Sequence, residues 1–158
     1  MVGSTSAVED TIDVMVGDKQ PISGVVYELY ETLGHPLFKV ASSIPSSLTA
    51  QIPPTADVDN SNIDLRHLRD VNMVGCTFGK MGSTVVTEVQ LHCNYQASAQ
   101  GIDELVDNLI LLFKQESPPS EIMHLLGKVD TAVYGSVFSL RISETTAEIE
   151  DLMRSLID

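Results

Sequence analysis

The chain has 158 residues, of which 43% are apolar, 5% aromatic and 20% charged. This composition predicts one soluble globular domain and excludes a disordered chain, because enough regularly spaced apolar sequence is present to form a core. Nine lysines and arginines stand against 22 aspartates and glutamates, a formal net charge of −13; so few cations argue against direct binding to nucleic acid or to anionic membranes.

The sequence also shows no targeting signal and no disulfide framework. The first residues carry no cationic region followed by an apolar stretch, and no window approaches the roughly 20 apolar residues of a transmembrane segment. Two cysteines, Cys76 and Cys93, are too few for a disulfide framework at this length. We therefore expect a cytoplasmic, intracellular protein in which both thiols are core residues.

The N-terminal part is predicted to form an arm followed by strands. Residues 1–10 are small, polar and acidic, which indicates a flexible arm, and residues 11–158 form the single domain. Residues 11–16 alternate apolar and polar types, residues 25–32 are rich in Val, Tyr and Leu, and residues 37–44 follow a Gly-His-Pro break. These patterns predict three strands, the last two pairing as a hairpin.

The next segment differs in composition. Residues 45–62 hold three prolines among small and polar residues and show no periodicity. We expect a long loop, either a lid, an arm that reaches a neighbouring subunit or a mobile segment. Residues 63–70 indicate one or two helical turns, residues 72–78 a strand, and residues 79–83 the turn after it.

Residues 84–96 give the clearest strand pattern. One set of alternate positions is mainly apolar, and the other is mainly polar: Val85, Thr87, Val89, Leu91, Cys93 and Tyr95 against Val86, Glu88, Gln90, His92, Asn94 and Gln96. Because successive side chains point to opposite faces, one face of this strand is expected to be buried and the other wet or covered by a polar partner. A purely parallel sheet, buried on both faces, would not give this alternation.

The C-terminal part contains the best helices. An apolar stripe at helical spacing predicts a helix over residues 102–114, and residues 120–126 predict a short one that Gly127 ends in the left-handed conformation. Residues 131–142 are predicted to be the last strand. A Thr-x-x-Glu capping box at residues 145–148 then begins a final helix.

Strands followed by helices predict an α+β fold. We expect a largely antiparallel sheet of about five or six strands, with the two main helices packed on one face.

The candidate ligand site is the polar face of the strand at residues 84–96. Glu88, Gln90 and His92 lie at i, i+2 and i+4, so they share a face on which a carboxylate could orient an imidazole. An exposed sheet face, or one covered by a subunit, explains the same pattern without a ligand.

Other motifs are incomplete. Residues 75–80 resemble a phosphate loop but are one residue short and lack its hydroxyl, and residues 57–62 resemble a calcium loop without its glycine and its glutamate. Asp64, His67 and Asp70 would share a helical face suited to a metal, but the neighbouring arginines favour ion pairing. His35 and His124 have no local partner set. We assign no catalytic residue, metal or cofactor.

These observations favour a non-catalytic protein–protein interaction module. We expect a structural protein, a self-associating subunit of a larger assembly, with a viral component as one example. Its partners are then proteins, most simply further copies of itself. The alternative is a small enzyme or small-ligand-binding protein that uses Glu88, Gln90 and His92, with residues 45–62 as a lid.

Overall fold

The computed structural model describes residues 24–33, 36–58, 61–116 and 118–155. The predicted arm at residues 1–10 and the predicted strand at residues 11–16 lie outside the described residues.

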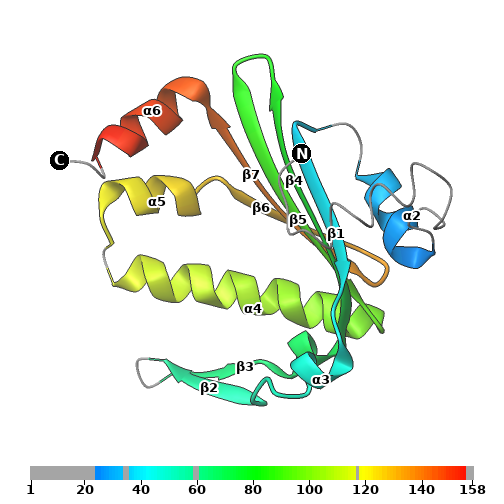
Figure 1. Ribbon diagram of the computed structural model, residues 1–158. Coiled ribbons are helices and arrows are strands. Elements are labelled where there is room, and N and C mark those ends of the chain that lie inside the picture. Colours follow the sequence, from blue (N-terminus) through cyan, green and yellow to red (C-terminus); the bar gives the residue numbers. More distant parts are fainter. Residues whose placement is uncertain (1–23, 34–35, 59–60, 117, 156–158) are drawn as a thin grey trace, which may run out of the picture.

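A five-stranded sheet forms the centre of the molecule (Figure 1). Its strands run in the order β1 (Phe38–Ser43), β4 (Val71–Met81), β5 (Thr84–Cys93), β7 (Val137–Thr145) and β6 (Val129–Tyr134). Every neighbouring pair is antiparallel. The predicted α+β class with a largely antiparallel sheet is therefore confirmed.

The remaining elements surround this sheet. A two-stranded sheet pairs β2 (Thr55–Val58) with β3 (Ser61–Asp64). The helices are α2 (Val25–Thr32), α3 (Ser46–Thr49), the 3-10 helix η1 (Arg66–Asp70), α4 (Gln96–Gln115), α5 (Ser120–Leu126) and α6 (Thr146–Ser155). Figure 1 shows α4, α5 and α6 on one side of the five-stranded sheet and α2 on the other.

The alternation predicted for β5 is present in the register. Leu91 lies opposite Val74 and Phe138, whereas Gln90 lies opposite Gly75 and Ser139. Cross-strand partners point to the same face of a sheet, so the apolar residues of three strands gather on the face that α4 covers. The buried core there contains Val71, Cys93, Ala99, Ile102 and Phe138. Tyr95 is no longer part of this face, because it stands at the N-cap of α4 and is exposed.

The segment Val25–Thr32 was predicted to be a strand, and this prediction is wrong. It forms the helix α2, which places Leu29 and Leu33 one turn apart against the second face of the sheet. A Cβ on Gly75 would lie 3.0 Å from Leu33 Cδ2, so the glycine makes room for the helix. Strand β1 consequently pairs with β4 and not with this segment.

Three further details differ from the sequence-based prediction. Residues 131–142 belong to two strands, because Gly135 adopts a positive φ of 59° and makes the turn between β6 and β7. Gly127 ends α5 in the right-handed region, with φ −75°. Residues 45–62, expected to be one loop, contain α3, β2 and the start of β3.

The β2–β3 hairpin and α4 enclose a groove of about 410 Å³. Its walls include Asp64 and His67 from the hairpin side and Gly101 and Glu104 from the helix. The His67 ring lies so close to α4 that a Cβ on Gly101 would overlap it. Gly101 is therefore required for the contact between η1 and α4.

We expect Gly101→Ala to lower the free energy of unfolding by about 1–3 kcal/mol, because the added methyl group displaces the His67 ring. In a His67→Ala background the same substitution should instead raise the free energy of unfolding by up to about 1 kcal/mol, since alanine is more favourable than glycine inside a helix. Urea denaturation of the four proteins of this cycle measures both values. Equal effects in the two backgrounds would contradict the close packing.

Candidate functional site

The predicted ligand residues lie on the centre of the sheet, on the face that α2 partly covers. Glu88, Gln90 and His92 come from β5, which has two strands on either side. The Gln90 side chain donates a hydrogen bond to Glu88 Oε1 at 2.8 Å. The structure thus places the three residues on one face, as their spacing predicts, but Glu88 is engaged by its neighbour Gln90.

His92 has no such partner among the described residues. Its Nε2 atom is buried without a hydrogen bond, and burial lowers the pKa of the imidazole. The expected orientation of His92 by a carboxylate is not formed in the described part of the chain. A ligand site on this face stays a prediction.

The other motifs of the sequence analysis do not assemble into sites. Asp64 lies in β3 and pairs with Arg66 at 2.6 Å, which holds the pKa of that carboxyl well below its usual range. Asp70 accepts a hydrogen bond from Ser98 Oγ at 2.5 Å. Asp64 and Asp70 thus lie in different elements, and the ion pairing with a neighbouring arginine that the sequence favoured is present at Asp64.

The segments that resemble a phosphate loop and a calcium loop also lie in strands. Residues 75–80 lie inside β4, where no phosphate-binding loop exists, and the described part of residues 57–62 belongs to the β2–β3 hairpin.

The outer part of the sheet exposes apolar side chains. Phe38 and Val40 of β1 lie opposite Phe78 and Cys76 of β4, on the face that carries Leu91 and Val89 further along. The exposed fractions of Phe38, Val40 and Phe78 are 58%, 45% and 44%. The α4 helix packs against β5, β6 and β7, and α2 covers the opposite face of β1 and β4. Within the described residues, these three side chains, here called the β1 surface, therefore remain exposed.

Acidic residues are missing around the β1 surface. Strands β1 and β4 together contain no aspartate or glutamate, although the whole chain has 22. Their charged residues are Lys39 and Lys80. Within the described residues, β1 pairs only with β4, and no strand lies along its other edge. Lys80 lies two residues from Phe78 and so belongs to the same face. An apolar face without carboxylates, beside an unpaired strand edge, is typical of a protein interface.

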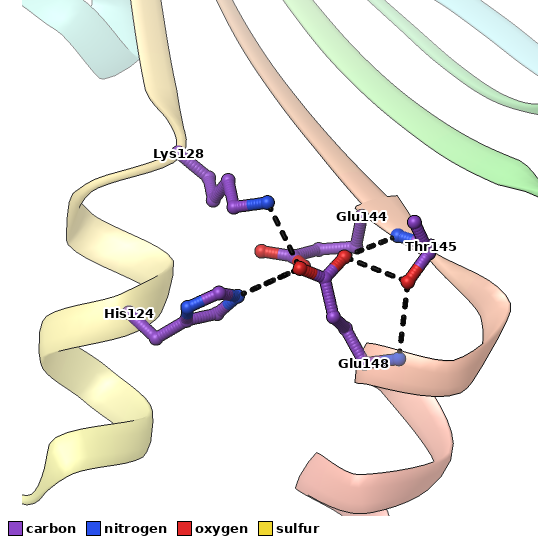
Figure 2. A network of polar contacts seen from close by, with 5 residues as sticks. All are labelled: His124, Lys128, Glu144, Thr145 and Glu148. Carbon is purple, nitrogen blue, oxygen red and sulfur yellow. Dashed lines mark hydrogen bonds and ion pairs between the residues drawn. The ribbon is translucent and has the colours of Figure 1, made fainter.

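A polar network joins three elements at the other end of the molecule (Figure 2). His124 of α5 faces Glu144 at the end of β7 and Glu148 in the first turn of α6. The His124 Nε2 atom lies 3.3 Å from Glu144 Oε2 and 3.4 Å from Glu148 Oε1. Lys128 Nζ forms an ion pair with Glu148 Oε1 at 3.0 Å.

Glu148 is held in place by the predicted capping box. The Thr145 backbone N–H and hydroxyl donate to Glu148 Oε2 at 2.7 and 2.8 Å, and the Glu148 N–H donates to Thr145 Oγ1 at 3.2 Å. These bonds with Thr145, together with Lys128, lower the pKa of Glu148 to about 2. Both ends of the box are formed, so this sequence-based prediction is confirmed.

Glu144 is the unusual member of the network. Its side chain is only 7% exposed, and its Oε1 atom is buried with no hydrogen-bond partner. A buried carboxylate oxygen without a partner is costly. Sequence reasoning missed this residue and assigned His124 no partners, because the contacts join residues 20 positions apart in the chain.

We expect Cys93 to be unreactive. The thiol is 5% exposed, and burial together with the Asp70 charge raises its pKa to about 11. At pH 8 only about one thiol in a thousand would be ionised, and the thiolate is the nucleophile. Iodoacetamide should label the half-buried Cys76 much faster than Cys93, as read by peptide mass spectrometry.

Labelling of Cys93 should accelerate as the pH is raised toward 11, or on unfolding in urea, which is the matched control. Fast labelling of Cys93 in the folded protein at pH 8 would contradict its placement in the core.

Among the described helices, none combines the length and the apolar character needed to cross a membrane. No family model, no curated protein and no solved structure matches the chain.

Proposed function

We propose that the chain is a non-catalytic interaction module that associates with further copies of itself through β1. The observation that carries the proposal is the β1 surface, where Phe38, Val40 and Phe78 are exposed beside a strand edge that is unpaired within the described part of the chain. Side chains of this size on one face give a protein partner a continuous apolar contact.

Charge favours a second copy as the partner. A chain with a net charge of −13 repels itself over most of its surface, and the repulsion is weakest where carboxylates are missing. Strands β1 and β4 are such a region. Antiparallel pairing of two β1 edges would extend the sheet across both copies and place the two β1 surfaces side by side. Repetition of such contacts is how an assembly subunit would work.

We expect sedimentation velocity to show a dimer or a larger species of the full chain. Phe38→Asp should shift the equilibrium toward monomer. We expect the dissociation constant to rise at least about tenfold, because the added carboxylate is desolvated at the contact. Tyr134→Asp is the matched control: it adds the same charge to an aromatic side chain that is 73% exposed on β6, at the opposite edge of the sheet.

A monomeric wild type at high concentration would contradict this proposal. So would an equal response to Phe38→Asp and Tyr134→Asp, which would indicate a general effect of charge.

The alternative function is small-ligand binding at Glu88, Gln90 and His92. One observation favours it, the buried and unpartnered Nε2 of His92, because a ligand donor or acceptor would satisfy this atom. The alternative predicts a small molecule that remains bound in native mass spectrometry of the purified chain and is lost in His92→Ala. Native spectra that show only the bare chain or its oligomers would contradict it.

A further inference from the structure

We propose that His124, Glu144 and Glu148 form a binding site for a divalent transition-metal ion of the zinc class. The three side chains come from α5, from the end of β7 and from α6, and their ligand atoms all lie within 4.8 Å of one another. The proposal is independent of self-association, because it uses residues of α5, β7 and α6, whereas the β1 surface lies on β1 and β4.

The distances from His124 to the two carboxylates fit ligands around a shared ion. Zinc binds histidine nitrogen and carboxylate oxygen at about 2.0–2.2 Å, so two ligands at the corners of a tetrahedron lie about 3.3–3.5 Å apart. The His124 Nε2 atom lies 3.3 Å from Glu144 Oε2 and 3.4 Å from Glu148 Oε1. A direct ionic hydrogen bond would be shorter, at about 2.7–2.9 Å.

The burial of Glu144 is an independent observation that favours a cation ligand. Its side chain is 93% buried, since its exposed fraction is 7%, and Oε1 has no hydrogen-bond partner in the part of the chain that the structure describes. Lys128 does not supply this partner, because its ion pair is with Glu148. In Figure 2 the Glu144 carboxylate points toward the space between His124 and Lys128. A bound ion would compensate for the desolvation of this carboxylate.

Neighbouring residues orient the proposed ligands. The hydrogen bonds from Thr145 hold Glu148 Oε2 and leave Oε1 within 3.4 Å of His124 Nε2, next to Lys128. The orientation of this ligand is therefore already fixed by its neighbours. The His124 side chain is 46% exposed, so water or an external ligand could supply the fourth position. Three protein ligands with one open position is the arrangement of reactive rather than purely structural zinc sites.

The ligand set selects among cations. One imidazole nitrogen with two carboxylates suits zinc and its neighbours in the transition series, whereas magnesium and calcium prefer six or more oxygen ligands. Lys128 carries a positive charge next to Glu148 and would compete with the metal for this carboxylate. Its removal should therefore strengthen binding.

The test is isothermal titration of the full chain with zinc chloride, with cobalt absorption as a second readout. We expect one zinc per chain and the intense visible bands of tetrahedral cobalt. Because loss of a residue that only supports a metal ligand already costs about 10–100-fold in affinity, His124→Ala and Glu144→Gln should each weaken binding by about 100-fold or more. Lys128→Gln should tighten it.

Asp64→Asn is the matched control, since it removes a carboxylate that also pairs with a cation but lies in β3; it should leave zinc binding unchanged. His124 is at the surface, so its variant stays informative even where Glu144→Gln fails to fold.

Absence of zinc binding to the folded wild type would overturn the proposal. So would equal affinity in His124→Ala, or weaker binding in Lys128→Gln, because the network would then be a set of ion pairs that needs no metal.

Discussion

The packing of α4 on one face of the sheet is the contact on which the rest of the molecule depends. Phe138 of β7 and Ile102 of α4, the largest fully buried side chains, meet in this layer, and Cys93 and Val71 join them. Because α4 crosses β5, β6 and β7, it leaves the apolar side of β1 and β4 uncovered. The same helix directs the chain away from the sheet, so that α5 returns beside the end of β7 (Figure 1). Both the exposed β1 surface and the polar network result from how far this one helix reaches.

The elements that the sequence predicts well are those whose pattern is local. In β5, alternation alone assigns Leu91 and His92 to opposite faces, and the apolar stripe of α4 needs no knowledge of its partner. The strand prediction for Val25–Thr32 is wrong because packing against a distant part of the chain decides the structure of this segment. Its β-branched and aromatic residues have a high strand propensity, but the packing of Leu29 and Leu33 above Gly75 overrides it. The hairpin of β6 and β7 was missed because a single glycine, Gly135, makes its turn between two apolar runs that read as one.

The same distinction between local patterns and long-range contacts separates the candidate sites that the sequence predicts from those that it does not. The capping box between Thr145 and Glu148 is visible in four consecutive residues, so it could be predicted. The meeting of His124 with Glu144 depends on the antiparallel return of β7 beside α5, which no local pattern contains. At Asp64 a local pattern is misleading. Its spacing from His67 and Asp70 suggests a shared helical face, but β3 extends through Asp64, so this residue is not part of the helix η1.

Charge explains why the two surfaces lie apart. A chain with 22 carboxylates can keep an apolar contact face only where those carboxylates are excluded, and β1 and β4 contain none. The carboxylates are instead concentrated in other elements, and at the junction of β7 and α6 two of them come within reach of one imidazole. There Lys128 neutralises Glu148, and Glu144 keeps one oxygen without a partner. At this junction the same excess of carboxylates brings two of them close together, and a cation is the most direct compensation.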